Sequence, residues 1–243
     1  MTVNKALSIV ALFNMDRKIL TVDEIARLIS LPKSSVYRHI RVLKDNGYLI
    51  EHSTGTYKLG YIFLGYANIV RSDISIVEVA HPVMNELTKV FDETTILSVL
   101  SDINAVCLAT TTPNQPIKVS SEEGQIVPLF SGASSKVILA YQDPGLLDKI
   151  IESGYIKKFT KNTITDKDGI LTELVNVRTR GYAKSLGEVD EGVMSLGFPI
   201  RNAKGNVFAS LAIAGPEYRM AEKDEQSIVQ EYQQAVKTIE SYF

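Results

Sequence analysis

The sequence predicts an α+β protein in which an N-terminal winged helix-turn-helix is joined by a linker helix to a second domain, an antiparallel sheet with packed helices. Apolar residues recur at helical spacing through the first 45 positions, and short alternating runs dominate from residue 95 to residue 120. With 243 residues and 45% hydrophobic content, the chain is long enough for two ordinary domains. The expected limits are 1–60 for the winged helix-turn-helix, 61–73 for the linker helix and 74–243 for the second domain.

Two helices are expected before residue 31. The first has apolar positions at helical spacing from Val3 to Phe13. The second starts at Thr21, a favourable N-cap residue, and Glu24 stands three residues later to complete a capping box. Its apolar face ends before Ser30, and the Leu31-Pro32 pair then turns the chain.

The segment from Leu31 to Tyr48 is expected to form a helix with two different faces. Val36, Ile40 and Leu43 fall on one face, at spacings of four and three residues. The remaining surface is polar and basic, and it comprises Lys33, Ser34, Tyr37, Arg38, Arg41 and Lys44. Long cations reach phosphates and guanine edges, so this surface suits the DNA major groove. A solvated amphipathic surface helix explains the segment, taken alone, equally well.

A β-hairpin is expected directly after this helix. Residues 48–52 and 56–59 are β-type runs on either side of Ser53-Thr54-Gly55, and they predict a wing beside the preceding helix. Two helices joined by a short turn and followed by a hairpin form a winged helix-turn-helix. The residues expected to contact duplex DNA are Thr21, Lys33, Ser34, Ser35, Tyr37, Arg38, Arg41, Lys44, Thr56 and Lys58.

Charge is divided unevenly along the chain. Up to Arg71 there are ten basic and five acidic residues, which gives a net charge of +5. Because the whole chain carries −2, the remainder carries −7. A basic N-terminal third on an acidic body is the division expected between a module that binds nucleic acid and one that does not.

Targeting and redox features point to the cytoplasm. The N-terminal apolar positions are interrupted by Asn4, Lys5 and Asn14, so they do not form a signal peptide or a membrane span. The single cysteine, Cys107, excludes intrachain disulfides and is expected to be a small buried apolar residue. We therefore expect a cytoplasmic protein without a membrane partner.

The second half is expected to form an antiparallel sheet with helices on its faces and ends. A linker helix from Leu59 to Arg71 precedes a helix from Ile74 to Phe91, in which Pro82 should produce a kink or mark a late start. Further helices are expected at 132–141, 146–151, 170–180 and 222–242. Strands are expected at 95–100, 105–112, 117–120, 193–200 and 207–214.

Five segments resemble the IclR family of bacterial transcription regulators, in the family's order and spacing. The segment TVNKALSIVALF and the run from Leu20 to Gly60, with LPKSSVYRHI, NGYL and YKLG, are similar to its DNA-binding domain. FSGASSKVILAY, RGYAKSLGEVDEGVMSLGFPI and ASLAIAGPEYRM are similar to its GAF-like ligand-sensing domain. The resemblance implies double-stranded operator DNA and a small-molecule metabolite as partners, and no cofactor. His39 stands where members usually carry leucine, and we expect it to be neutral and to lie at the inner edge of the helix.

The resemblance also implies an effector pocket, whose positions correspond to Ala133, Ser134, Ser135, Ser185, Val193, Ser195, Ala212 and Ala214. Ser185 is expected in a loop. Many members carry an acidic residue at Ser185 and serine at Ala212 and Ala214, so this pocket offers fewer hydrogen-bond partners. Because a buried unpaired polar group costs about 1–3 kcal/mol, this pocket should not favour a small, densely polar acid. The start of the helix at 134–141 has partial positive charge and unpaired N–H donors, so we expect a carboxylate-bearing ligand with a larger apolar part. Alternatively, Ala212 and Ala214 only pack a strand.

Catalytic and metal-binding patterns are missing from the sequence. The three histidines are scattered, and neither a phosphate-binding loop nor a nucleophile elbow occurs. Glu188, Asp190 and Glu191 resemble a carboxylate pair, but a solvated loop is the expected explanation. Three classes of protein were compared: a ligand-responsive DNA-binding regulator, an enzyme with a DNA-binding appendage, and an architectural DNA binder whose second domain only oligomerises. The first is favoured, and the chain is not expected to be an enzyme.

A homo-oligomer is expected, either a dimer or a tetramer. A single winged helix-turn-helix covers too little DNA for strong specificity, so two copies are needed on a pseudo-palindrome. The apolar stripes of the first helix and of the linker helix offer the pairing surface. A ligand that changes subunit placement would then alter DNA affinity by about 1–3 kcal/mol.

Overall fold

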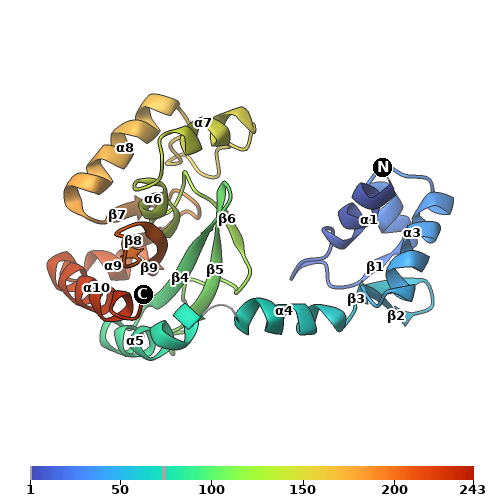
Figure 1. Ribbon diagram of the computed structural model, residues 1–243, viewed down its shortest axis with the longest axis horizontal. Coiled ribbons are helices and arrows are strands. Elements are labelled where there is room, and N and C mark those ends of the chain that lie inside the picture. Colours follow the sequence, from blue (N-terminus) through green and yellow to red (C-terminus); the bar gives the residue numbers. More distant parts are fainter. Residues whose placement is uncertain (1, 73–74) are drawn as a thin grey trace. The chain divides into compact units, whose positions relative to one another are not determined.

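The computed structural model describes residues 2–72 and 75–243 (Figure 1). The chain divides into two compact units, Met1–Ile74 and Ser75–Phe243, which are described separately. Three predicted limits lie outside the described residues: residue 1 of the first domain, residue 73 at the end of the linker helix, and residue 74 at the start of the second domain.

Three helices of the first unit pack around one small core. They are α1 (Thr2–Val10), α2 (Val22–Leu28) and α3 (Lys33–Asp45). The predicted capping box of α2 is confirmed, because the Glu24 amide donates to Thr21 Oγ1 at 3.2 Å and the Thr21 amide donates to Glu24 Oε2 at 2.8 Å. The core between the helices includes Ile9, Ile25, Val36, Ile40 and Leu49, all buried.

The predicted wing is confirmed as β2 (Leu49–Ser53) and β3 (Thr56–Leu59), which pair antiparallel. The prediction missed a third strand, β1 (Leu20–Thr21), which pairs with β3 and is too short to show alternation. Helix α4 (Ile62–Ser72) follows the wing. Gly60 lies so close to the carbonyl oxygen of Gly47 that a Cβ atom would overlap it, so only glycine fits between the wing and α4.

The second unit is built on a six-stranded antiparallel sheet with the order β6-β5-β4-β9-β8-β7. The strands are β4 (Thr94–Ser101), β5 (Asn104–Thr111), β6 (Ile126–Pro128), β7 (Ala183–Leu186), β8 (Val193–Arg201) and β9 (Val207–Pro216). The helices are α5 (Ser75–Phe91), α6 (Ala133–Leu139), α7 (Gly145–Glu152), α8 (Lys167–Arg180), α9 (Glu217–Ala221) and α10 (Glu225–Glu240).

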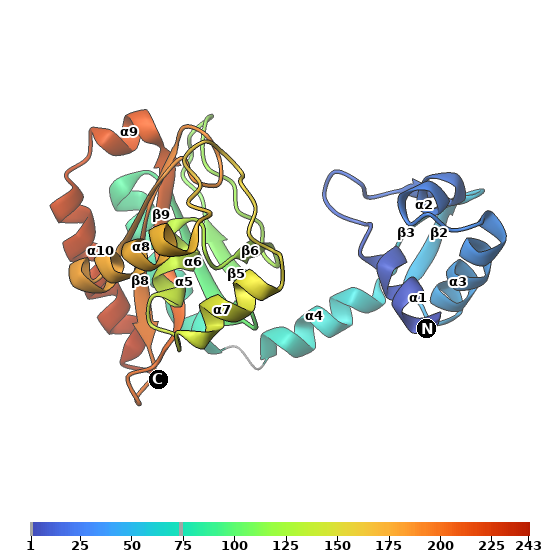
Figure 2. The ribbon, with the colours of Figure 1, turned by 90° about the horizontal axis from the view of Figure 1, so that it is seen from above.

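Helices cover both faces of this sheet, as Figure 2 shows from above. On one face lie α5 and α10, where the hydroxyls of Thr95 on β4 and Tyr232 on α10 are 2.6 Å apart. On the other face lies α6, where Ser210 Oγ of β9 donates to the carbonyl oxygen of Ser134 at 2.8 Å. Helices α7 and α8 pack against α6 in a second core that includes Phe130, Ile150 and Leu174.

Three predictions about the second unit are wrong, and one strand was missed. Residues 117–120 form a loop and not a strand, because side chains hold their carbonyls: Thr94 Oγ1 donates to Val119 at 2.7 Å. The strand beside β5 is β6, which the sequence analysis missed. Ser185 lies in β7 and not in a loop. The last helix starts at Glu225 and not at 222. Pro82 does not mark a late start of α5, which begins at Ser75 and continues through Pro82, while the kink expected there as the alternative stays a prediction.

Candidate functional site

The polar face of α3 is exposed to solvent. Ser34, Tyr37, Arg38 and Arg41 are exposed, and the side chain of Tyr37 is 55% accessible. The opposite stripe, which consists of Val36, Ile40 and Leu43, is buried as predicted. The residues expected to contact DNA on α3 therefore form one surface, with Ser35 half-buried at its margin. This geometry alone fits both a DNA-reading helix and a solvated surface helix.

Three cations of this face form ion pairs that the sequence analysis missed. Lys33 Nζ lies 2.8 Å from Asp23, Lys44 Nζ lies 2.6 Å from Glu51, and Arg41 Nε lies 3.9 Å from Asp45. The hydrogen bonds to the two carboxylates raise the pKa of Lys33 and the pKa of Lys44. The Arg41–Asp45 pair has the i,i+4 spacing and could have been found from sequence. The other two pairs join different elements and could not.

Three other residues expected to contact DNA also have partners within the chain. The Thr21 hydroxyl belongs to the capping box of α2. Thr56 Oγ1 accepts from the Ser53 amide at 3.0 Å and holds the turn of the wing. Lys58 Nζ lies 5.6 Å from the centre of the Tyr61 ring. Thr21 and Thr56 therefore shape the elements around α3.

His39 lies on the buried side of α3 and is 3% exposed. Burial lowers its pKa below the usual value, and the nearby charges of Arg38 and Lys5 lower it further. The pKa shift supports the neutral form expected from sequence at this inner position.

Replacing His39 with leucine is expected to reduce the pH dependence of the stability of the first unit. Because the pKa of His39 is lower in the folded state, the unfolded chain binds the proton first as the pH falls. Stability is therefore full above the unfolded pKa of about 6.5 and is lost below it. Urea denaturation at about pH 7.5 and about pH 5 should show a smaller loss for His39→Leu. Equal losses in the two proteins would contradict this account.

The predicted effector residues of the strands share one face of the sheet. Ser195 pairs with Ser185 on one side and Ala214 on the other, and directly paired residues point to the same face. Val193 and Ala212 stand two positions from members of this set and so share the face. The start of α6 lies on the same face, because a Cβ atom at Gly197 would overlap the carbonyl of Ala133. Six of the eight residues are thus placed together from β7, β8, β9 and α6.

Two serines at the start of α6 differ in their environment. Ser134 is half-buried and accepts a hydrogen bond from Ser210 through its carbonyl oxygen. Ser135 is fully buried, and within the described part of the chain its hydroxyl oxygen has no hydrogen-bond partner. An unpaired buried hydroxyl is costly, and a ligand group is one way to satisfy it.

The expectation of a solvated loop is wrong for Glu188, although Asp190 and Glu191 are exposed. Glu188 is 7% exposed and its Oε1 lies 2.6 Å from Nζ of Lys136, which is itself buried. Lys136 also lies 3.3 Å from Glu173 and donates to the carbonyl of Lys184 at 2.9 Å. The three loop acids that looked alike in sequence therefore lie in two different environments: Glu188 is buried, and Asp190 and Glu191 are exposed.

Glu188 also changes the expected chemistry at the start of α6. Its Oε2 accepts a hydrogen bond from the Gly132 amide at 3.3 Å, so a carboxylate of the chain already lies there. Because the positive end of a helix attracts negative charge, Glu188 takes up part of the attraction that we assigned to a ligand.

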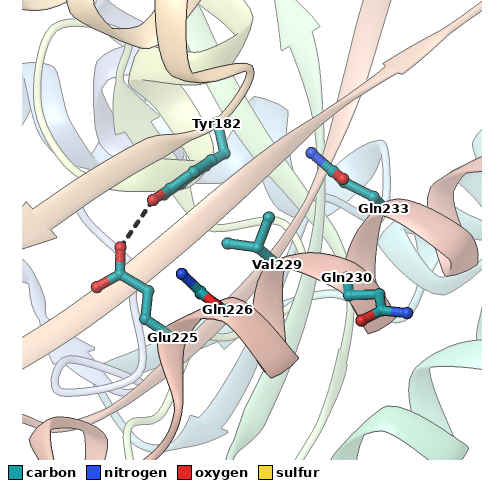
Figure 3. Close-up of a pocket in the computed structure, with 6 residues that line it drawn as sticks. All are labelled: Tyr182, Glu225, Gln226, Val229, Gln230 and Gln233. Atoms are coloured by element: carbon teal, nitrogen blue, oxygen red, sulfur yellow. Dashed lines mark hydrogen bonds between the residues drawn. The ribbon is translucent and has the colours of Figure 1, made fainter.

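A separate groove of about 560 Å³ runs along the outer side of α10 (Figure 3). Its lining residues are Tyr182, Glu225, Gln226, Val229, Gln230 and Gln233. The Tyr182 hydroxyl donates to Glu225 Oε1 at 2.7 Å, and Lys184 lies 2.6 Å from the same carboxylate. The hydrogen bond from Lys184 lowers the pKa of Glu225. This groove contains none of the predicted effector residues.

Within residues 2–72 and 75–243, no group of three His, Cys, Asp or Glu side chains is arranged to hold a metal ion. Among the helices of the same ranges, none combines the length and the apolar character needed to cross a membrane.

Comparison with known proteins identifies the segment that contains α3 as a helix-turn-helix domain. Residues 2–51 match the IclR helix-turn-helix domain, and residues 69–241 match the bacterial transcriptional regulator IclR C-terminal domain. The chain belongs to the IclR family. It is 30% identical over 221 residues to the HTH-type transcriptional regulator KipR of Bacillus subtilis, covering 91% of this chain and 88% of KipR. It is also 28% identical over 209 residues to KdgR of Escherichia coli, covering 86% and 80% of the two chains.

Solved structures agree with this family assignment. An IclR regulator from Silicibacter superposes with a TM-score of 0.83 at 28% identity, covering 100% of this chain and 96% of that one. An IclR homologue from Microbacterium hydrocarbonoxydans, complexed with 4-hydroxybenzoate, has the same fold, with a TM-score of 0.84 at 22% identity and coverage of 99% and 98%. The protein is therefore an IclR-family transcriptional regulator with a DNA-binding helix-turn-helix and a C-terminal effector domain, and not an enzyme.

Proposed function

We propose that this regulator acts in the cytoplasm and binds a pseudo-palindromic operator as a dimer or a dimer of dimers, with an affinity that a small carboxylate-bearing metabolite modulates. The observation that supports it most is the exposed polar face of α3, opposite a fully buried stripe, in a chain that matches both IclR domains. Arg38 and Ser34 are the proposed contacts to bases, and Lys33, Lys44 and Lys58 the proposed contacts to phosphates.

Pairing of two chains is proposed to use apolar side chains of α1, of α4 and of Tyr61, which directly precedes α4. Val3, Leu7, Tyr61 and Leu64 are all more than 60% exposed, at 70%, 61%, 69% and 63%. Such exposed apolar side chains are typical of surfaces that contact another protein. We expect the parent to sediment as a dimer or larger at micromolar concentration, and Leu7→Glu with Leu64→Glu to shift it toward the 26.9 kDa monomer. A parent that sediments only as a monomer would rule out this pairing.

The effector is proposed to bind on the α6 face of the sheet, against Ala133, Ser134, Ser135, Ser185, Val193, Ser195, Ala212 and Ala214. Two observations support a ligand with one polar end and an apolar body. The Ser135 hydroxyl has no partner among the residues that the structure describes, and the apolar residues Ile96, Cys107 and Ala214 pack together on this face. The 4-hydroxybenzoate of the Microbacterium homologue is a molecule of this kind.

Filling this face is expected to abolish the ligand response while leaving DNA affinity intact. A thermal-shift screen of aromatic and aliphatic carboxylic acids would first identify a stabilising compound. Ala212→Phe should then lose the shift, because the added ring occupies the ligand's space. Since Ala212 is 1% exposed, the milder Ser195→Leu is measured beside it to separate loss of the site from loss of the fold. An unchanged shift in both variants would place the pocket elsewhere.

A further inference from the structure

We propose that three acidic side chains around α3, Asp23, Asp45 and Glu51, restrain its cations and thereby limit binding to DNA of any sequence. The inference rests on the proposed DNA-binding function and deepens it. The polar face of α3 carries four long cations, and Arg38 is the one that has no carboxylate partner among the described residues. The other three each have one, at 2.8 Å for Lys33, 3.9 Å for Arg41 and 2.6 Å for Lys44.

Folding stability gives little reason for two of these three pairs. The Lys33–Asp23 side chains are 61% and 68% exposed, and the Arg41–Asp45 side chains are 85% and 67% exposed. Ion pairs this exposed contribute little to stability. Asp45 is also the last residue of α3, where the negative end of the helix disfavours an acid. What the three acids share is that each lies beside a cation that is proposed to contact DNA.

Two of the acids keep a second partner or a favourable helix position when their lysine leaves. Glu51 accepts a hydrogen bond from the Gly55 amide at 3.2 Å as well as from Lys44. Asp23 lies in the first turn of α2, where the positive end of the helix favours a carboxylate. Each lysine can therefore exchange its carboxylate for a phosphate while the acid keeps a favourable environment.

The three ion pairs should weaken the affinity for DNA of random sequence in particular. That affinity comes almost entirely from cations that neutralise phosphates and release counterions. A lysine held by a carboxylate of its own chain releases fewer counterions, and the remaining carboxylate repels the backbone. Contacts to base edges, which we assign to Arg38 and Ser34, are not weakened in this way. The acids thus make stable binding depend more on base contacts, which matters because random sites greatly outnumber operators.

Removal of the acids tests this proposal directly. The variants are Asp23→Asn, Glu51→Gln and their combination, measured on a random-sequence duplex by fluorescence anisotropy at several salt concentrations. Each single variant should bind about fivefold more tightly, the scale set by two unit charges about 4 Å apart in water. The salt dependence should steepen by about one unit of slope for each lysine released.

The matched control is Asp16→Asn, which makes the same charge change at an exposed position in the same unit. Within the described residues, Asp16 pairs with none of the four cations. If Asp16→Asn raises affinity and slope as much as the two variants, net charge alone is responsible and the proposal is wrong. Unchanged affinity in the variants also overturns it. Failure of the parent to bind any duplex is a separate outcome, and it contradicts the proposed DNA-binding function itself.

Discussion

Replacing Arg38 and Arg41 together with alanine is expected to remove most of the operator affinity. Each guanidinium that reads a base edge contributes about 1–3 kcal/mol, and one that contacts only phosphate contributes less and does so on every sequence. Both side chains point into solvent from a helix whose opposite face is buried, so the fold should be retained. Arg38 should have the larger share, because Arg41 already has a carboxylate neighbour.

The matched control is Arg17→Ala with Lys18→Ala, which removes two positive charges from exposed positions in the first unit but outside α3. Anisotropy titrations on the operator and on a random duplex separate the two contributions of the arginines. The α3 variant should lose more affinity for the operator than for the random duplex, and the control should lose similar amounts on both. Parental operator affinity in the α3 variant would show that this face does not read DNA.

Replacing Arg219 with methionine is expected to cause the largest loss of stability in the second unit. Glu93 is fully buried, and both of its oxygens bind the guanidinium, at 2.7 Å from Nε and 2.8 Å from Nη2. The hydrogen bonds to Glu93 raise the pKa of Arg219 above its usual value. Without the arginine, a buried carboxylate loses its main partner, which costs about 3–5 kcal/mol.

Chemical denaturation of the full chain, followed by circular dichroism, measures this loss. Lys223→Met is the control, because Lys223 Nζ lies 3.7 Å from the same carboxylate and its loss should cost much less. The double variant Arg219→Met with Glu93→Gln should recover part of the stability, since it removes the uncompensated charge. A single Arg219→Met variant as stable as the control would show that Glu93 does not depend on the pair.

Elements with a strong periodic pattern were predictable from sequence. The stripe of Val36, Ile40 and Leu43 and the capping box at Thr21 are local patterns, and both are found as predicted. The two-residue β1 and the three-residue β6 are too short for any pattern and were missed. The run at 117–120 alternates like a strand, but its carbonyls bind side chains of distant elements, including Arg219.

The candidate sites show the same division. The exposed face of α3 follows from helical spacing, and the family resemblance led to residues that the strand register places on one face of the sheet. The pairs Lys33–Asp23 and Lys136–Glu188 join residues that are 10 and 52 positions apart in the sequence. A local sequence pattern therefore could not predict them. Because the pair with Lys136 was not predictable, Glu188 was expected to be solvated, whereas it is a buried partner of α6.

Selection of bound sequences from a random duplex library by the full-length chain is the most direct test of the central claim. The account predicts enrichment of an inverted repeat whose half-sites lie about one helical turn, or a multiple of it, apart. It also predicts that the Arg38→Ala, Arg41→Ala variant loses the enrichment while the Arg17→Ala, Lys18→Ala variant keeps it. Enrichment of no sequence by the parent, or of the same repeat by the α3 variant, would contradict the account.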